Sequence, residues 1–135
     1  IDEKLFNLPI SLEVLELHGV INNELDYLPE GLKTLVLCTY NKELSNLPTR
    51  LENLILLCKY SGNLCNLPPG LKFIHLHPLQ NTLNIELPKN IQRVNFGYGD
   101  DDDDKFMSEL KKLYPKVIYN DHDYLSNIER YYDEI

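Results

Sequence analysis

Leucine and proline recur along the chain in one phrase, L-P-x-x-L-x-x-L-x-L, whose apolar positions are separated by polar or variable ones. The Leu-Pro pairs recur at intervals of 20, 19, 20 and 20 residues, and the five copies read LPISLEVLEL, LPEGLKTLVL, LPTRLENLIL, LPPGLKFIHL and LPKNIQRVNF. A fixed period of this length is typical of solenoids, in which each copy packs against its neighbours. We therefore expect one repeat-built domain over residues 1–99.

The last three positions of each copy, L-x-L, predict a short β-strand. In Leu15-Glu16-Leu17 both leucines point to one side of an extended chain, and the residue between them points to the other. One strand cannot bury its leucines alone, so we expect the copies to stack as parallel strands about 4.8 Å apart. Proline has a fixed φ and no N–H, which places it outside the strands. An earlier apolar residue of each copy closes the interior: Leu12, Leu32, Leu51, Leu71 and Ile91.

Residues 100–135 break the repeat. An acidic run is followed by apolar residues at helical spacing and then by a proline: Asp100 to Asp104, then Phe106, Leu110 and Leu113, then Pro115. The sequence KVIY at residues 116–119 predicts a short strand, and a second helix is expected from Tyr124, Leu125, Ile128 and Tyr132. The last repeat would otherwise expose its apolar end to water, so we expect residues 100–135 to be a capping segment of helix, strand and helix.

Composition narrows the function classes. The net charge of −8 comes without the clustered Lys and Arg that a phosphate backbone requires, so we expect no nucleic-acid partner. No apolar run reaches the roughly 20 residues of a membrane span, and we expect no secretory signal before the first residue. Three cysteines without a C-x-x-C spacing indicate reduced thiols. We expect a cytoplasmic protein, in its own cell or in a host cell cytosol, with no membrane contact and no cofactor. The chain starts at Ile1, inside the repeating pattern, which leaves open a missing N-terminal segment.

The L-x-x-L-x-L copies resemble leucine-rich repeats, and the L-P start, as in LSNLPTRLENLIL, is similar to the short subtype of bacterial effectors. The sequence FNLPI at residues 6–10 also resembles the FNIP-type repeat of amoebae and large DNA viruses. The chain has no Ala, whose codons begin with GC, which suggests an AT-rich genome and favours a viral or amoebal source. The resemblance covers residues 5–97. It implies an α/β fold, a leucine-rich-repeat solenoid with a parallel concave sheet and a helical C-terminal cap.

The resemblance also implies a curved binding scaffold. We expect a non-enzymatic protein–protein interaction module that binds a protein partner on its concave face. FNIP-type repeats occur in proteins that carry F-box modules, and the bacterial subtype precedes ubiquitin-ligase domains. The chain is therefore alternatively the substrate-recognition part of a ubiquitin-ligase system. A structural or assembly role is a third possibility, and the sequence leaves the oligomeric state open.

Stacking in register would place the outward side chains of the five strands on one grid. Apolar residues fill its middle and polar residues its ends, which matches an interface with an apolar centre and a polar rim. Ordinary β-forming residues on a half-exposed sheet would give the same pattern. We expect Phe73 to be the main anchor. The expected partner-binding residues are Val14, Glu16, His18, Val36, Ile55, Leu57, Phe73, His75, His77 and Arg93.

The histidines of this grid are candidates for metal binding and for catalysis. His75 and His77 are expected on one face, either as solvated rim residues or as partner contacts. His18, three repeats away at about 14 Å, is too far to share a metal with them, so we expect no metal site. No Ser or Cys has a His and a carboxylate at a spacing that the repeat brings together, so we expect no catalytic residue and no enzymatic activity. The run Asp100 to Asp104 is either an acidic hook for a basic partner or a solvated loop.

Overall fold

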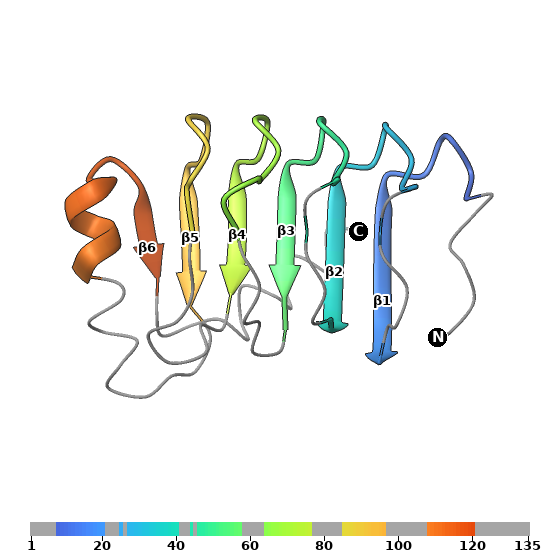
Figure 1. Ribbon diagram of the computed structural model, residues 1–135, viewed down its shortest axis with the longest axis horizontal. Helices are drawn as coiled ribbons and strands as arrows, with labels where there is room; N and C mark the ends of the chain where they lie inside the picture. Colours follow the sequence, from blue (N-terminus) through green and yellow to red (C-terminus); the bar gives the residue numbers. More distant parts are fainter. Residues whose placement is uncertain are drawn as a thin grey trace.

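The computed structural model describes residues 8–20, 25, 27–40, 44, 46–57, 64–76, 85–96 and 108–120. These residues form one six-stranded sheet in which every neighbouring pair of strands is parallel and the strands follow sequence order (Figure 1). The parallel stacking predicted from the repeat is therefore confirmed. The strands are β1 (Val14–Val20), β2 (Thr34–Thr39), β3 (Asn53–Leu56), β4 (Phe73–Leu76), β5 (Arg93–Phe96) and β6 (Ile118–Asn120).

The register of the sheet follows the repeated phrase. Equivalent apolar positions lie side by side on successive strands, in the row Leu15, Leu35, Leu54, Ile74 and Val94. A one-residue slip would turn each of these side chains to the other face, so burial of the row fixes the pairing. The single interval of 19 residues changes only the length of the connection, and β2 and β3 pair in the same register as the other strands.

A tight turn precedes each of the first five strands. In the first copy the Leu12 N–H donates to the Pro9 carbonyl at 3.1 Å, and the same bond recurs in the other four copies at 3.1 or 3.2 Å. Proline is the first residue of each turn and contributes the carbonyl that accepts this bond, and its missing N–H is not needed there. The phrase L-P-x-x-L therefore closes a turn, and L-x-L forms the strand that follows it.

The hydrophobic core lies on one face of the sheet. In the row of equivalent apolar positions given above, the side chains from Leu35 to Val94 are fully buried. The leucines that close the turns are fully buried as well, namely Leu32, Leu51 and Leu71. Leucines from the connections between repeats complete this core, namely Leu25, Leu44 and Leu64. Full burial of such a side chain contributes about 1.5 to 3 kcal/mol, which explains why the phrase keeps these positions apolar.

The segment after the repeats matches its predicted elements in part. Residues 108–113 are helical, and Leu110 is buried as predicted. Leu113, expected on the same apolar stripe, is 70% exposed, so this part of the prediction is wrong. The strand expected at residues 116–119 lies at Ile118–Asn120 and pairs with β5. The predicted second helix and the acidic run lie outside the described residues.

Tyr119 joins β6 to the preceding helix. Its hydroxyl lies 3.1 Å from the Leu110 carbonyl oxygen and 2.9 Å from the Tyr114 carbonyl oxygen, and it donates to both. The Tyr114 hydroxyl in turn accepts the backbone N–H of Leu87, at 3.2 Å, which ties this segment to the fifth repeat. Partial burial raises the pKa of Tyr119 above its usual value, and the neighbouring Tyr114 adds to the effect. No helix in this described part of the chain is long and apolar enough to cross a membrane.

Candidate functional site

The second face of the sheet, opposite the leucine core, carries the residues predicted to bind a partner. Cross-strand pairing places them in rows, as the grid predicted. One row runs from Thr34 through Asn53, Phe73 and Arg93 to Ile118. The next row, referred to below as the middle row, consists of Glu16, Val36, Ile55, His75 and Asn95.

The middle row is buried over most of its length. Val36, His75 and Asn95 have no exposed surface, and Ile55 is 1% exposed. The expectation that Val36, Ile55 and His75 are open to a partner is therefore wrong. Val36 and Ile55 are buried outside the leucine core, so the sheet is covered on both faces at this row. Alternation along a strand identifies the face to which a side chain points, but it carries no information on what covers that face.

Hydrogen bonds between side chains cross the strands on this face. The Asn95 side-chain amide donates to His75 Nδ1 at 2.8 Å, which leaves the proton of a neutral ring on Nε2. Asn53 donates in the same way to the Thr34 hydroxyl at 3.1 Å. Buried polar groups need such partners, because an unsatisfied one costs about 1 to 3 kcal/mol. His75 is therefore a structural residue of the sheet rather than a solvated rim residue.

The rows on either side of the middle row remain partly accessible. Val14, Phe73 and Leu57 are half-buried, whereas Arg93 and His18 are exposed. His77 lies outside the described residues. Of the predicted partner-binding residues in the described part of the chain, six can therefore be reached from solvent: Val14, Glu16, His18, Leu57, Phe73 and Arg93.

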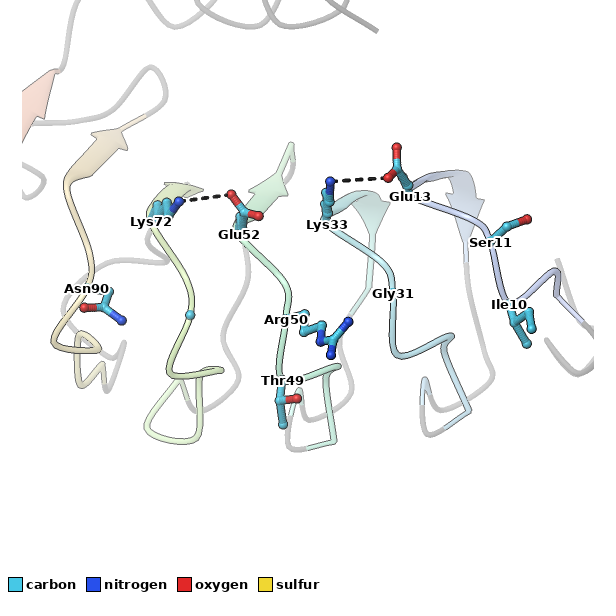
Figure 2. A pocket seen from close by; sticks show the side chains of 11 residues that line it. Ile10, Ser11, Glu13, Gly31, Lys33, Thr49, Arg50, Glu52, Lys72 and Asn90 are labelled. Carbon is cyan, nitrogen blue, oxygen red and sulfur yellow. Dashed lines mark ion pairs between the residues drawn. The ribbon is translucent and has the colours of Figure 1, made fainter.

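Sequence reasoning missed a groove that follows the row of turns before the strands (Figure 2). The groove has a volume of about 680 Å³ and takes residues from all five repeats. Its lining comes from the variable positions of the phrase: Ile10, Ser11, Glu13, Gly31, Lys33, Thr49, Arg50, Glu52, Gly70, Lys72 and Asn90. One signal was present in the sequence, since the residue after the second leucine alternates in charge over the first four copies: Glu13, Lys33, Glu52 and Lys72.

Two ion pairs divide the groove. Lys33 Nζ lies 3.3 Å from Glu13 Oε1, and Lys72 Nζ lies 3.3 Å from Glu52 Oε1 (Figure 2). Each pair joins adjacent repeats at the surface, where such pairs contribute about 0 to 1 kcal/mol. Arg50 extends between the two pairs, toward the turn that carries Gly31 (Figure 2). It makes no ion pair with the described residues, so among the lining residues that the structure describes Arg50 is the one charged side chain outside the two pairs.

A second polar cluster lies where β1 and β2 end. Cys38 Sγ is 3.0 Å from His18 Nδ1, and His18 Nε2 is 3.5 Å from Glu16 Oε2. The prediction that no Cys has a His and a carboxylate within reach is therefore wrong. His18 and Cys38 are 20 residues apart, which is one repeat, so stacking of adjacent repeats brings them together. Within the described residues, no group of three or more His, Cys, Asp and Glu side chains converges to hold a metal ion.

Comparison of the chain with protein-family models, with characterised proteins and with solved structures finds no match.

Proposed function

We propose that the protein is a protein-binding module that holds an extended segment of its partner in the groove along the turns. The groove supports this proposal because it crosses every repeat. Five stacked strands span about 19 Å at about 4.8 Å between neighbours. An extended chain covers that distance with about six residues at about 3.3 Å per residue. The sheet would be one wall of a leucine-rich-repeat solenoid, with residues 100–135 as its C-terminal cap.

The side chains of the groove favour a particular segment. Arg50 brings a guanidinium without an ion pair among the described residues, and its planar donors suit a carboxylate of the partner. Ile10, at the first repeat, is 91% exposed and offers an apolar contact. The chain as a whole has a net charge of −8, which repels a strongly acidic partner. The segment that fits has one carboxylate near its centre and an apolar side chain about 10 Å away, two repeat spacings along the groove.

The groove also leaves room for a backbone. Gly31 and Gly70 lie in its wall and carry no side chain. Without side chains at these positions, a partner backbone can approach the turns closely. Main-chain contacts of this kind supply affinity, whereas Arg50 and Ile10 would supply specificity.

Selection of peptides from a random library displayed on phage, with the full chain immobilised, tests this proposal. We expect enriched peptides to carry a carboxylate, and Arg50→Glu to weaken their binding at least about tenfold through charge reversal. Arg93→Glu is the matched control, because Arg93 is an exposed cation on the sheet face outside the groove. The proposal is wrong if no peptide is enriched, or if binding responds to Arg93→Glu or Phe73→Asp and not to Arg50→Glu. The second result would place the partner on the sheet face.

A further inference from the structure

The cluster of Glu16, His18 and Cys38 stands on an irregularity of the sheet. β1 and β2 pair residue by residue from Val14 to Leu17, and pairing resumes with Val20 opposite Thr39. Two residues of β1 therefore lie opposite one residue of β2, which is a β-bulge. Gly19 is in the bulge with φ +90°, in the left-handed region that favours glycine. Bulges redirect side chains, and this one lies where the His18 ring meets the Cys38 sulfur.

The three side chains have the arrangement of an activated nucleophile. The two ring nitrogens of His18 face different partners, Nδ1 the sulfur of Cys38 and Nε2 the carboxylate of Glu16. A thiol gains reactivity when a base within hydrogen-bonding distance takes its proton and a third group orients that base. The His18 side chain is 62% exposed and Cys38 is half-buried, so a small molecule can reach the sulfur. On the other side of Cys38 the next strand places Leu57, which adds no charge.

One of the two carboxylate oxygens of Glu16 faces His18, and the other lacks a hydrogen bond within the described part of the chain. Its Oε1 is buried and has no hydrogen-bond partner among the described residues. With the carboxylate 3.5 Å from His18 Nε2, that nitrogen can donate its hydrogen to Glu16, which leaves Nδ1 to face the Cys38 sulfur as the base.

We propose that Cys38 is a modification site that undergoes thiol–disulfide exchange with small disulfides, with His18 as its base and Glu16 as the residue that positions His18. His18 Nδ1 takes the thiol proton, and the thiolate attacks one sulfur of the small disulfide. A new S–S bond forms between that sulfur and Cys38 while the original S–S bond breaks. The leaving thiolate then takes the proton from the imidazolium. Cys38 and the thiol half it binds become a mixed disulfide, the other half leaves reduced, and a second thiol reverses the step.

The test uses the full chain and a neutral aromatic disulfide, dithiodipyridine. Brief reaction followed by mass spectrometry of peptides gives the rate at each cysteine separately. At about pH 6.5, where unassisted thiols are mostly protonated, we expect Cys38 to react about tenfold faster than the exposed Cys65. At about pH 9 the difference should shrink, because thiols ionise there without a base. The proposal is overturned if Cys38 reacts no faster than Cys65 at the lower pH.

Variants separate the roles of the two neighbours. His18→Gln should slow Cys38 about tenfold at about pH 6.5 and much less at about pH 9. Glu16→Gln should also slow Cys38 more at about pH 6.5 than at about pH 9, by a smaller factor than His18→Gln does. A purely structural effect would instead lower the Cys38 rate equally at the two pH values. Gly19→Ala disturbs the bulge without changing a reacting group, and it should also slow Cys38 while leaving Cys65 unchanged. If the Cys38 rate of His18→Gln has the same pH dependence as that of the unsubstituted chain, the imidazole is not the base. A melting curve of each variant verifies that it is folded.

Discussion

Replacement of Ile55 by alanine tests whether the middle row is buried. Ile55 is 1% exposed and lies next to Leu54, which is fully buried on the opposite face in the leucine core. Truncation of a buried Leu or Ile to Ala lowers the free energy of unfolding by about 2 to 5 kcal/mol. We therefore expect about 3 kcal/mol for Ile55→Ala, close to the effect of Leu54→Ala.

Phe73 provides the contrast, because it lies on the same face of the sheet as Ile55 but is half-buried. Phe73→Ala should lower the free energy of unfolding by about 1 kcal/mol, the range of β-propensity effects at partly exposed positions. In a chain of 135 residues, 1 kcal/mol corresponds to about 4 °C in Tm. Calorimetry should thus show Tm about 12 °C lower for Ile55→Ala and about 4 °C lower for Phe73→Ala.

The comparison has a clear failure. If Ile55→Ala lowers Tm by no more than Phe73→Ala does, while Leu54→Ala gives its full effect, the second face is open at the middle row. The burial argument would then be wrong, and Ile55 would return to the accessible surface for a partner. A large loss for both Ile55→Ala and Leu54→Ala supports a sheet covered on both faces.

Three further predictions follow from individual contacts. The raised pKa of Tyr119 means that its stabilising effect is complete below about pH 10, its usual value, and is lost as pH rises through the higher folded-state value; Tyr119→Phe should flatten the alkaline part of a urea-midpoint-against-pH curve, and an unchanged curve would contradict this. Asn95→Ala removes the amide that donates to His75 Nδ1 and should cost about 1 to 3 kcal/mol in urea unfolding; a loss below about 0.5 kcal/mol would show that the hydrogen bond is not needed. Gly31→Ala should be tolerated better than Gly70→Ala, because the nearest atom to the added Cβ is 3.4 Å away in the first case and 3.2 Å in the second; equal melting temperatures would argue against the tighter contact.

The sheet could be predicted from the sequence because the same strand pattern is repeated in every copy. L-x-L recurs at a nearly constant interval, so the same pairing satisfies every copy, and burial of residues such as Leu35 and Leu54 excludes a slipped register. The cysteine cluster was also within reach, since the 20 residues between His18 and Cys38 equal one repeat.

The rest depends on information that one strand does not carry. The burial of Val36 and His75 comes from what lies over the sheet, which alternation along β2 and β4 cannot describe. The groove depends on the shape of successive turns, and its lining residues differ from copy to copy. The alternating charges from Glu13 to Lys72 form ion pairs because the turns place adjacent repeats side by side.

The strand order of the sheet also determines how the chain can reach it. From β1 to β5 each strand pairs with the next strand in the chain, so partners are 19 or 20 residues apart. Relative to the whole length this separation is about 0.15, within the range of mixed domains that fold at intermediate speed. Folding can start at any adjacent pair of repeats and extend from there, and the insertion or deletion of a whole repeat leaves the separation unchanged. Duplication or loss of a repeat within the gene could therefore lengthen or shorten the groove without making the protein slower to fold.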